Sequence, residues 1–153
     1  GIPLDKFAEK YLFTPLDIKY VSWRFTPMGR VVAQGNFKIS NRNMDKIGQL
    51  VLNKGLYKDK QIVSQKWIEE SIKARHPVTW NNYDSYGYQW YNHAITVKGD
   101  LIPYVLASGN GGNKIYIVDK HKLVVTVSST AYGKRRGHDR SLNILKRALE
   151  DIN

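Results

Sequence analysis

The fold of this chain is decided by residues 114–128, KIYIVDKHKLVVTVS. Two runs rich in β-branched and aromatic residues, 114–118 and 123–128, flank a short polar turn, which is the pattern of a β-hairpin. Ile115 and Tyr116 point to opposite faces of the first run, and both are apolar. Strands that are apolar on both faces lie inside a sheet covered above and below. The stretch therefore predicts a hairpin at the centre of a sheet.

The rest of the chain supplies further strands and the helices that cover the sheet. Ser40 and Ser64 stand where helix N-caps are expected, before runs with apolar residues at helical spacing. Residues 16–39 read as irregular. The predicted strands are 86–93 and 101–107, and the predicted helices are 4–14, 41–54, 64–76 and one that begins near Asp139 or Ser141 and runs to the end. Helices, then antiparallel strands, then a closing helix predict an α+β fold.

The bulk composition describes a globular chain. Its 153 residues are enough for one domain, spanning 1–153, and 42% of them are hydrophobic. No cysteine is present, which excludes disulfides, thiolate metal sites and a cysteine nucleophile. The formal net charge is +11, but the basic residues are spread out. The one dense group, Lys134-Arg135-Arg136 with His138 and Arg140, reads as a solvated loop before the last helix.

Catalytic motifs are scarce in this sequence. The four histidines lack metal-ligand spacing, so we expect no metal. A serine nucleophile with a lysine base on one helix face needs lysine three residues after serine. None of the nine serines has lysine at that position.

The remaining feature is the glycine-rich stretch 107–113, ASGNGGN. One reading is a tight loop or bulge between two strands. The other is a strand end whose backbone N–H groups receive a substrate carbonyl. The stretch alone leaves both open.

Four segments, in order, resemble the C-terminal portion of the serine β-lactamase-like and penicillin-binding-protein family. The likeness extends over about residues 3–150, but Asp17 and Asn43 replace a usual Gly and Asp. The segments are 3–16 (PLDKFAEKYLFTPL), 33–44 (AQGNFKISNRNM), 86–90 (YGYQW) and 108–116 (SGNGGNKIY). The resemblance implies part of the β-lactamase/transpeptidase-like fold, an antiparallel sheet with flanking helices, without the region that carries the nucleophile.

The family's reaction is acyl transfer from a serine of a Ser-x-x-Lys motif, aided by a tyrosine. Asn110, Gly111 and Gly112 match the family's third catalytic motif, and the backbone N–H of Asn113 would be an oxyanion-hole donor. Asn110 stands where the family has Lys or His, so it brings no cation. The resemblance also places Ser108, Gly109, Tyr86 and Tyr88 at the substrate. The family's serine, lysine and tyrosine motifs are absent from this chain.

The resemblance implies a parent that is an exported, bacterial hydrolase of an ester, amide or β-lactam, periplasmic or secreted, with no cofactor. The chain alone is not expected to be active. Its partners would be a small or peptide-like acyl substrate, without nucleic acid and without a membrane span. Self-association is expected through the surface that the missing half leaves uncovered. Two other classes remain open: a non-catalytic ligand-binding or scaffold module, and a basic nucleic-acid- or surface-binding domain.

Overall fold

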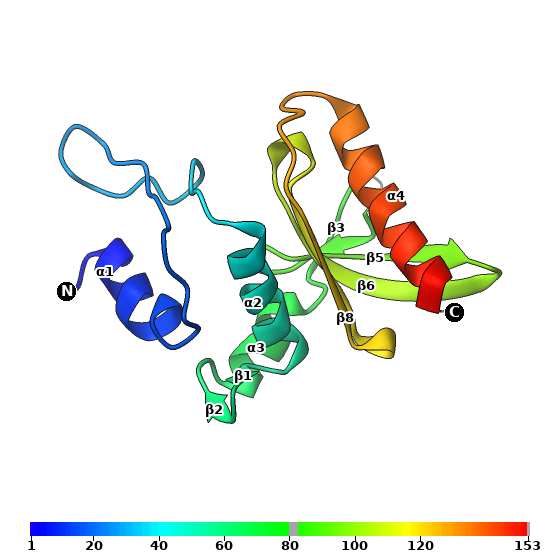
Figure 1. The fold of residues 1–153 in the computed structure, drawn as a ribbon, viewed down its shortest axis with the longest axis horizontal. Coiled ribbons are helices and arrows are strands. Elements are labelled where there is room, and N and C mark those ends of the chain that lie inside the picture. The colour runs from blue at the N-terminus through cyan, green and yellow to red at the C-terminus, as the bar shows by residue number, and fades with distance from the viewer. Residues whose placement is uncertain (80–82, 153) are drawn as a thin grey trace.

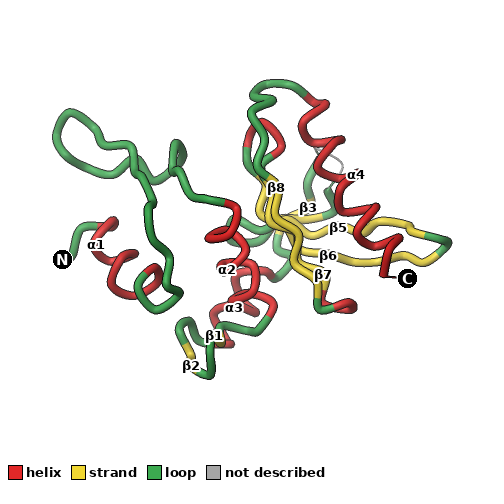
Figure 2. Tube along the Cα trace, in the orientation of Figure 1, coloured by secondary structure: helices red, strands yellow, loops and turns green. Residues whose placement is uncertain are grey.

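The computed structural model describes residues 1–79 and 83–152, and Figures 1 and 2 show the arrangement of its elements. Helical elements are α1 (Leu4–Ala8), a π-helical turn (Glu9–Phe13), α2 (Asn41–Leu52), α3 (Gln65–Ile72) and α4 (Arg135–Ile152), with 3-10 turns at Asn110–Gly112 and Asp119–His121. The strands are β1 (Leu56–Tyr57), β2 (Lys60–Gln61), β3 (His76–Pro77), β4 (Ser85–Tyr86), β5 (Tyr91–Val97), β6 (Asp100–Ser108), β7 (Lys114–Val118) and β8 (Leu123–Val127).

The six strands β3 to β8 form one antiparallel sheet in chain order. The predicted hairpin is confirmed as β7 and β8, with Lys114 opposite Val127 and Val118 opposite Leu123. Its predicted central position holds for β7 only, because β8 is the last strand of the described sheet and is mostly half-buried. All five residues of β7 are buried, as expected for a strand covered on both faces. The α+β class, an antiparallel sheet with flanking helices, is therefore confirmed.

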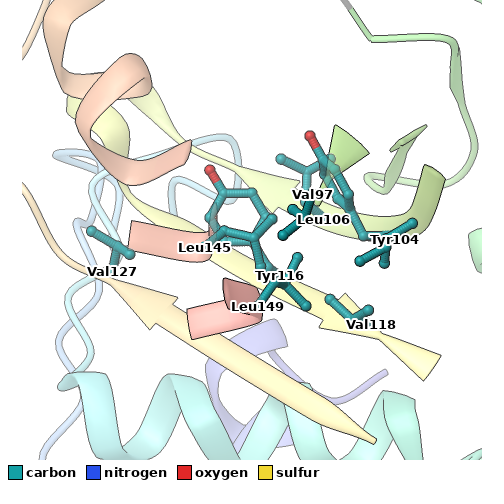
Figure 3. Packing of buried hydrophobic residues seen from close by; sticks show 9 residues of the cluster. Val97, Tyr104, Leu106, Tyr116, Val118, Val127, Leu145 and Leu149 are labelled. Carbon is teal, nitrogen blue, oxygen red and sulfur yellow. The ribbon is translucent and has the colours of Figure 1, made fainter. Parts of the chain in front are cut away.

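The two faces of the sheet are covered by different helices, which lie on opposite sides of it in Figure 1. One face, here called the α4 face, packs Tyr104, Leu106 and Tyr116 against Leu145 and Leu149 of α4. Figure 3 shows this cluster from close by. The other, the α2 face, packs side chains of β7 and β8 against α2 and α3; the buried members are Val51, Leu52, Ile68, Ile115 and Ile117.

The helix starts at Ser40 and Ser64 follow the capping pattern. Ser40 Oγ accepts a hydrogen bond from Asn43 N at 3.3 Å, and Ser64 Oγ accepts one from Trp67 N at 3.2 Å. Both N-caps predicted from sequence are confirmed, because capping depends only on residues within one helical turn.

The N-terminal segment packs beside α2 through a small core of its own. Phe13, Leu16 and Ile18 are buried with Leu50 of α2. Residues 16–39 are largely irregular, as predicted, with isolated bridges pairing Ser22 with Lys38 and Phe25 with Val31.

Three predicted boundaries are wrong. The helix expected over 64–76 ends at Ile72, and His76 and Pro77 form β3. The single strand expected over 86–93 is divided into β4 and β5 by a bend at Gly87–Trp90, where Gln89 has a φ of 67°. The last helix begins at Arg135 rather than near Asp139 or Ser141. Of the basic residues taken for a loop, only Lys134 precedes the helix, and the others lie in its first two turns. Gly137, which reads as a helix breaker, is buried in that helix against the carbonyl of Gly111, and this packing outweighs local propensity.

No described helix is long and apolar enough to cross a membrane.

Candidate functional site

The glycine-rich stretch forms a turn between β6 and β7, next to the N-terminal end of α4 (Figure 1). Gly111 and Gly112 have φ values of 80° and 89°, a region that side chains disfavour. A Cβ on Gly112 would lie 2.3 Å from the carbonyl oxygen of Gly137 in α4. Two of the three glycines are therefore required by backbone conformation and by close approach of the helix.

The two asparagines of this turn use their side chains to fasten it. Asn113 Nδ2 donates to Asn110 O at 2.8 Å, and Asn113 Oδ1 accepts from Ser129 N at 3.0 Å. Asn110 Oδ1 accepts from Gly133 N at 3.0 Å, in the segment that leads into α4. Both amides thus have structural contacts. The oxyanion role of the Asn113 backbone N–H stays a prediction.

The tyrosines predicted to meet substrate lie away from the turn. Tyr86 is in β4, two strands from β6, where its ring lies 4.4 Å from that of Tyr91 and its hydroxyl donates to Gln89. The Tyr88 ring stacks on that of Trp67, with ring centroids 5.7 Å apart, and the Arg75 guanidinium lies 4.3 Å from the Tyr88 ring centroid. The structure brings Ser108, Gly109 and Asn110–Asn113 together but not Tyr86 and Tyr88 with them.

A polar cluster that the sequence search missed lies just behind the turn. Lys114, the first residue of β7, is only 1% exposed. Its Nζ contacts Ser108 Oγ and lies 3.0 Å from Tyr83 Oη and 2.9 Å from His138 Nδ1. The cluster joins β6, β7, α4 and the segment before β4.

This cluster has no counterpart in a Ser-x-x-Lys motif, in which serine and lysine share one helix face. Ser108 and Lys114 are six residues apart and face each other across the β6–β7 register. One feature of the sequence could have indicated the cluster: Lys114 is the first residue of an otherwise apolar strand. A lysine that is buried in such a strand requires polar partners.

Burial shifts the protonation of the cluster. It lowers the pKa of Lys114 to about 8 from an ordinary value of 10.5. Burial likewise lowers the pKa of His138, helped by the nearby Lys114 charge and opposed by Asp139. Burial raises the pKa of Tyr83, opposed by its hydrogen bond to Ser108. At neutral pH Lys114 is therefore mostly charged, and His138 is mostly neutral.

A serine hydroxyl beside an amine of lowered pKa is chemically a nucleophile with a base. However, Ser108 and Lys114 do not line either of the two hollows described below, and three polar partners surround the ammonium. The contacts fit a buried cation that is satisfied and positions His138.

His138 lines a hollow of about 420 Å³ on the α4 face of the sheet. Tyr83, His93, Tyr104 and Tyr116 form one wall, and their rings follow one another with centroids 5.6 to 6.0 Å apart. Asn110, Gly133, Lys134, Arg135, Asp139 and Leu142 complete the lining. A second hollow, of about 490 Å³, lies between α1 and residues 17–23. Across residues 1–79 and 83–152, no three His, Asp or Glu side chains are placed to hold a metal.

No family model and no curated protein matches this sequence. Solved structures do match, including a protein from Bacillus anthracis provisionally named a 6-aminohexanoate-dimer hydrolase, with a TM-score of 0.75 and 21% identity over 99% of this chain and 40% of that one. An octameric penicillin-binding protein homologue from Pyrococcus abyssi matches with a TM-score of 0.62 and 19% identity over 92% and 37%. A protein from Bacteroides dorei, provisionally named a β-lactamase, matches with a TM-score of 0.59 and 7% identity over 89% and 49%.

These likenesses confirm that the chain has a β-lactamase/transpeptidase-like fold. They cover nearly all of this chain but less than half of each neighbour. The chain thus spans part of that fold.

Proposed function

We propose that this chain is the C-terminal part of a serine hydrolase of the β-lactamase and penicillin-binding-protein type. The supporting observation is the likeness in fold to the Bacillus anthracis protein, which is provisionally named a hydrolase. That likeness extends over 99% of this chain but only 40% of that protein. The missing Ser-x-x-Lys motif agrees with a nucleophile that lies outside these residues.

In this proposal the chain supplies one wall of an acyl-transfer site. The turn Asn110–Gly112 corresponds to the third catalytic motif, and the backbone N–H of Asn113 stabilises the oxyanion. The substrate is an ester, an amide or a β-lactam. Asn110 is neutral, so it cannot pair with a substrate carboxylate as a lysine would. The parent acts outside the cytoplasm and uses no organic cofactor or metal.

Covalent labelling tests the proposal. The 153-residue chain and the longest polypeptide that its gene encodes are each incubated with a fluorophosphonate and, separately, with a penicillin, and their intact masses are measured. We expect no adduct on the 153-residue chain and a fluorophosphonate adduct on a longer polypeptide that includes a Ser-x-x-Lys motif. A stoichiometric adduct on the short chain that Ser108→Ala abolishes would contradict the proposal, because the nucleophile would then be Ser108 with Lys114 as its base.

We further propose that the chain self-associates through apolar surface left uncovered in this part of the fold. Phe7 and Tyr11 of the N-terminal helical segment form an aromatic pair 4.7 Å apart and are 51% and 45% exposed. Exposed apolar patches favour association. Sedimentation velocity should show a dimer or larger species that Phe7→Glu weakens. A monomer at all concentrations would contradict this.

A further inference from the structure

Two tyrosine hydroxyls at the hollow on the α4 face have no hydrogen-bond partner among the described residues. Tyr104 and Tyr116 are 4% and 1% exposed, and both line the hollow. The hydroxyls of Tyr83 and Tyr86 hydrogen-bond to described residues, whereas those of Tyr104 and Tyr116 do not. Figure 3 shows both oxygens pointing to the same side of the cluster. The rings are buried, but neither hydroxyl oxygen is itself fully buried, so both oxygens are accessible to a ligand or to solvent in the hollow.

The groups around the hollow are mainly hydrogen-bond donors. Burial raises the pKa of both tyrosines, so their hydroxyls stay protonated and can donate. His138 Nδ1 accepts from the Lys114 ammonium, which leaves the proton of the neutral ring on Nε2, a third donor.

The charge at the mouth of the hollow is also positive. Lys134 and Arg135 stand at the N-terminal end of α4, where the helix dipole already places positive charge. Cationic side chains are repelled by the positive end of the helix dipole, and a bound anion would offset this repulsion. Asp139 is the one described acidic residue in the lining. The Lys114 ammonium, 2.9 Å behind His138, adds a further positive charge.

We propose that this hollow binds a small organic oxyanion, a carboxylate or phosphate on an aromatic or apolar body. The anionic oxygens accept from Tyr104, Tyr116 and His138 Nε2 and face Arg135. The body packs against the aromatic wall and Leu142. The volume of about 420 Å³ lies within the roughly 300–1,000 Å³ typical of small-molecule sites. This site is on the face of the sheet opposite to α2. It shares Asn110 with the turn assigned to the proposed hydrolase site, but ligand binding here does not require hydrolase activity.

Isothermal titration of the 153-residue chain tests the site with phenyl phosphate, benzoate and inorganic phosphate, and with benzyl alcohol as an uncharged control. We expect saturable binding of phenyl phosphate or benzoate, or both, weaker binding of inorganic phosphate and none of benzyl alcohol. The comparison of phenyl phosphate with benzoate distinguishes a phosphate site from a carboxylate site.

Matched variants identify the hollow as the site. Tyr116→Phe removes one unpartnered hydroxyl and should weaken binding about tenfold, as loss of one charge-assisted hydrogen bond does. Arg135→Gln should weaken it by a similar factor, whereas Arg140→Gln, the same change in the same helix outside the lining, should not.

Equal effects of the two arginine variants would overturn the proposal, since binding would then follow net charge alone. Saturable binding that Tyr116→Phe and Tyr104→Phe both leave unchanged, or no saturable binding, would overturn it too. The same titration on the longest polypeptide of the gene must also saturate. Loss of binding there would mean that a protein segment fills the hollow, and would equally overturn the proposal.

Discussion

Replacing Lys114 with methionine should change how the stability of this protein depends on pH. In the folded chain the ammonium is 1% exposed, and burial lowers its pKa to about 8. The unfolded chain has the ordinary value of about 10.5, so between pH 8 and 10.5 it binds more protons than the folded chain. Stability therefore rises with pH through this window, and the charged lysine costs most at and below pH 7.

The magnitude follows from these two pKa values. The full difference of about 2.5 units corresponds to about 3 kcal/mol, of which about 1 kcal/mol is recovered between pH 7 and pH 9. The wild-type protein should thus gain about 1 kcal/mol in unfolding free energy relative to Lys114→Met over that interval. Below pH 9 the tyrosines with raised pKa values do not yet ionise, so they do not mask the effect.

Urea denaturation followed by tryptophan fluorescence measures this difference. Wild type, Lys114→Met and Lys60→Met, a change at an exposed lysine, are compared at pH 7 and pH 9. Lys60→Met should track the wild type. If Lys114→Met also tracks the wild type, Lys114 is not a buried charge, and the assignment of the His138 tautomer fails with it.

Three further outcomes are expected. Gly112→Ala should lower the free energy of unfolding by about 3 kcal/mol, through left-handed backbone strain and the clash with Gly137 O. Gly133 has a φ of 68° but open space around it, so Gly133→Ala should lower that free energy by only about 1 kcal/mol in thermal unfolding. Equal losses would contradict the packing of α4 on the turn. Ser40→Ala should cost about 1 kcal/mol in urea denaturation through loss of the cap of α2, and no loss would mean that the cap is unimportant. Because burial lowers the pKa of His138, acidification from pH 7 to 5 should destabilise wild type more than His138→Gln by thermal unfolding; identical pH profiles would contradict the burial of its ring.

The sequence by itself determined the features that depend on neighbouring residues. The caps at Ser40 and Ser64 and the β7–β8 hairpin follow from contacts within a few positions, so their patterns are legible in the chain. The order of these elements and four short motifs were also enough to indicate the β-lactamase/transpeptidase-like fold, which the solved structures confirm.

The local sequence pattern gave the wrong boundary for one strand and for the last helix, because contacts with distant residues determine both boundaries. The bend at Gly87–Trp90 interrupts a run that alternates like one strand: Gly87 N donates to Trp90 O at 2.7 Å, and Tyr88 N donates to the carbonyl of Ser71 at the end of α3 at 2.8 Å. The start of α4 lies at Arg135, although Gly137 and three cations argue against a helix there, because Gly137 permits close contact with the glycine-rich turn.

Only the tertiary structure placed Ser108 beside Lys114, His138 behind it, and the hydroxyls of Tyr104 and Tyr116 around one hollow. These residues come from two strands and a helix that are up to 34 positions apart in the chain, from Tyr104 to His138. Their proximity follows from strand register and from the packing of α4, and neither leaves a short-range pattern in the sequence.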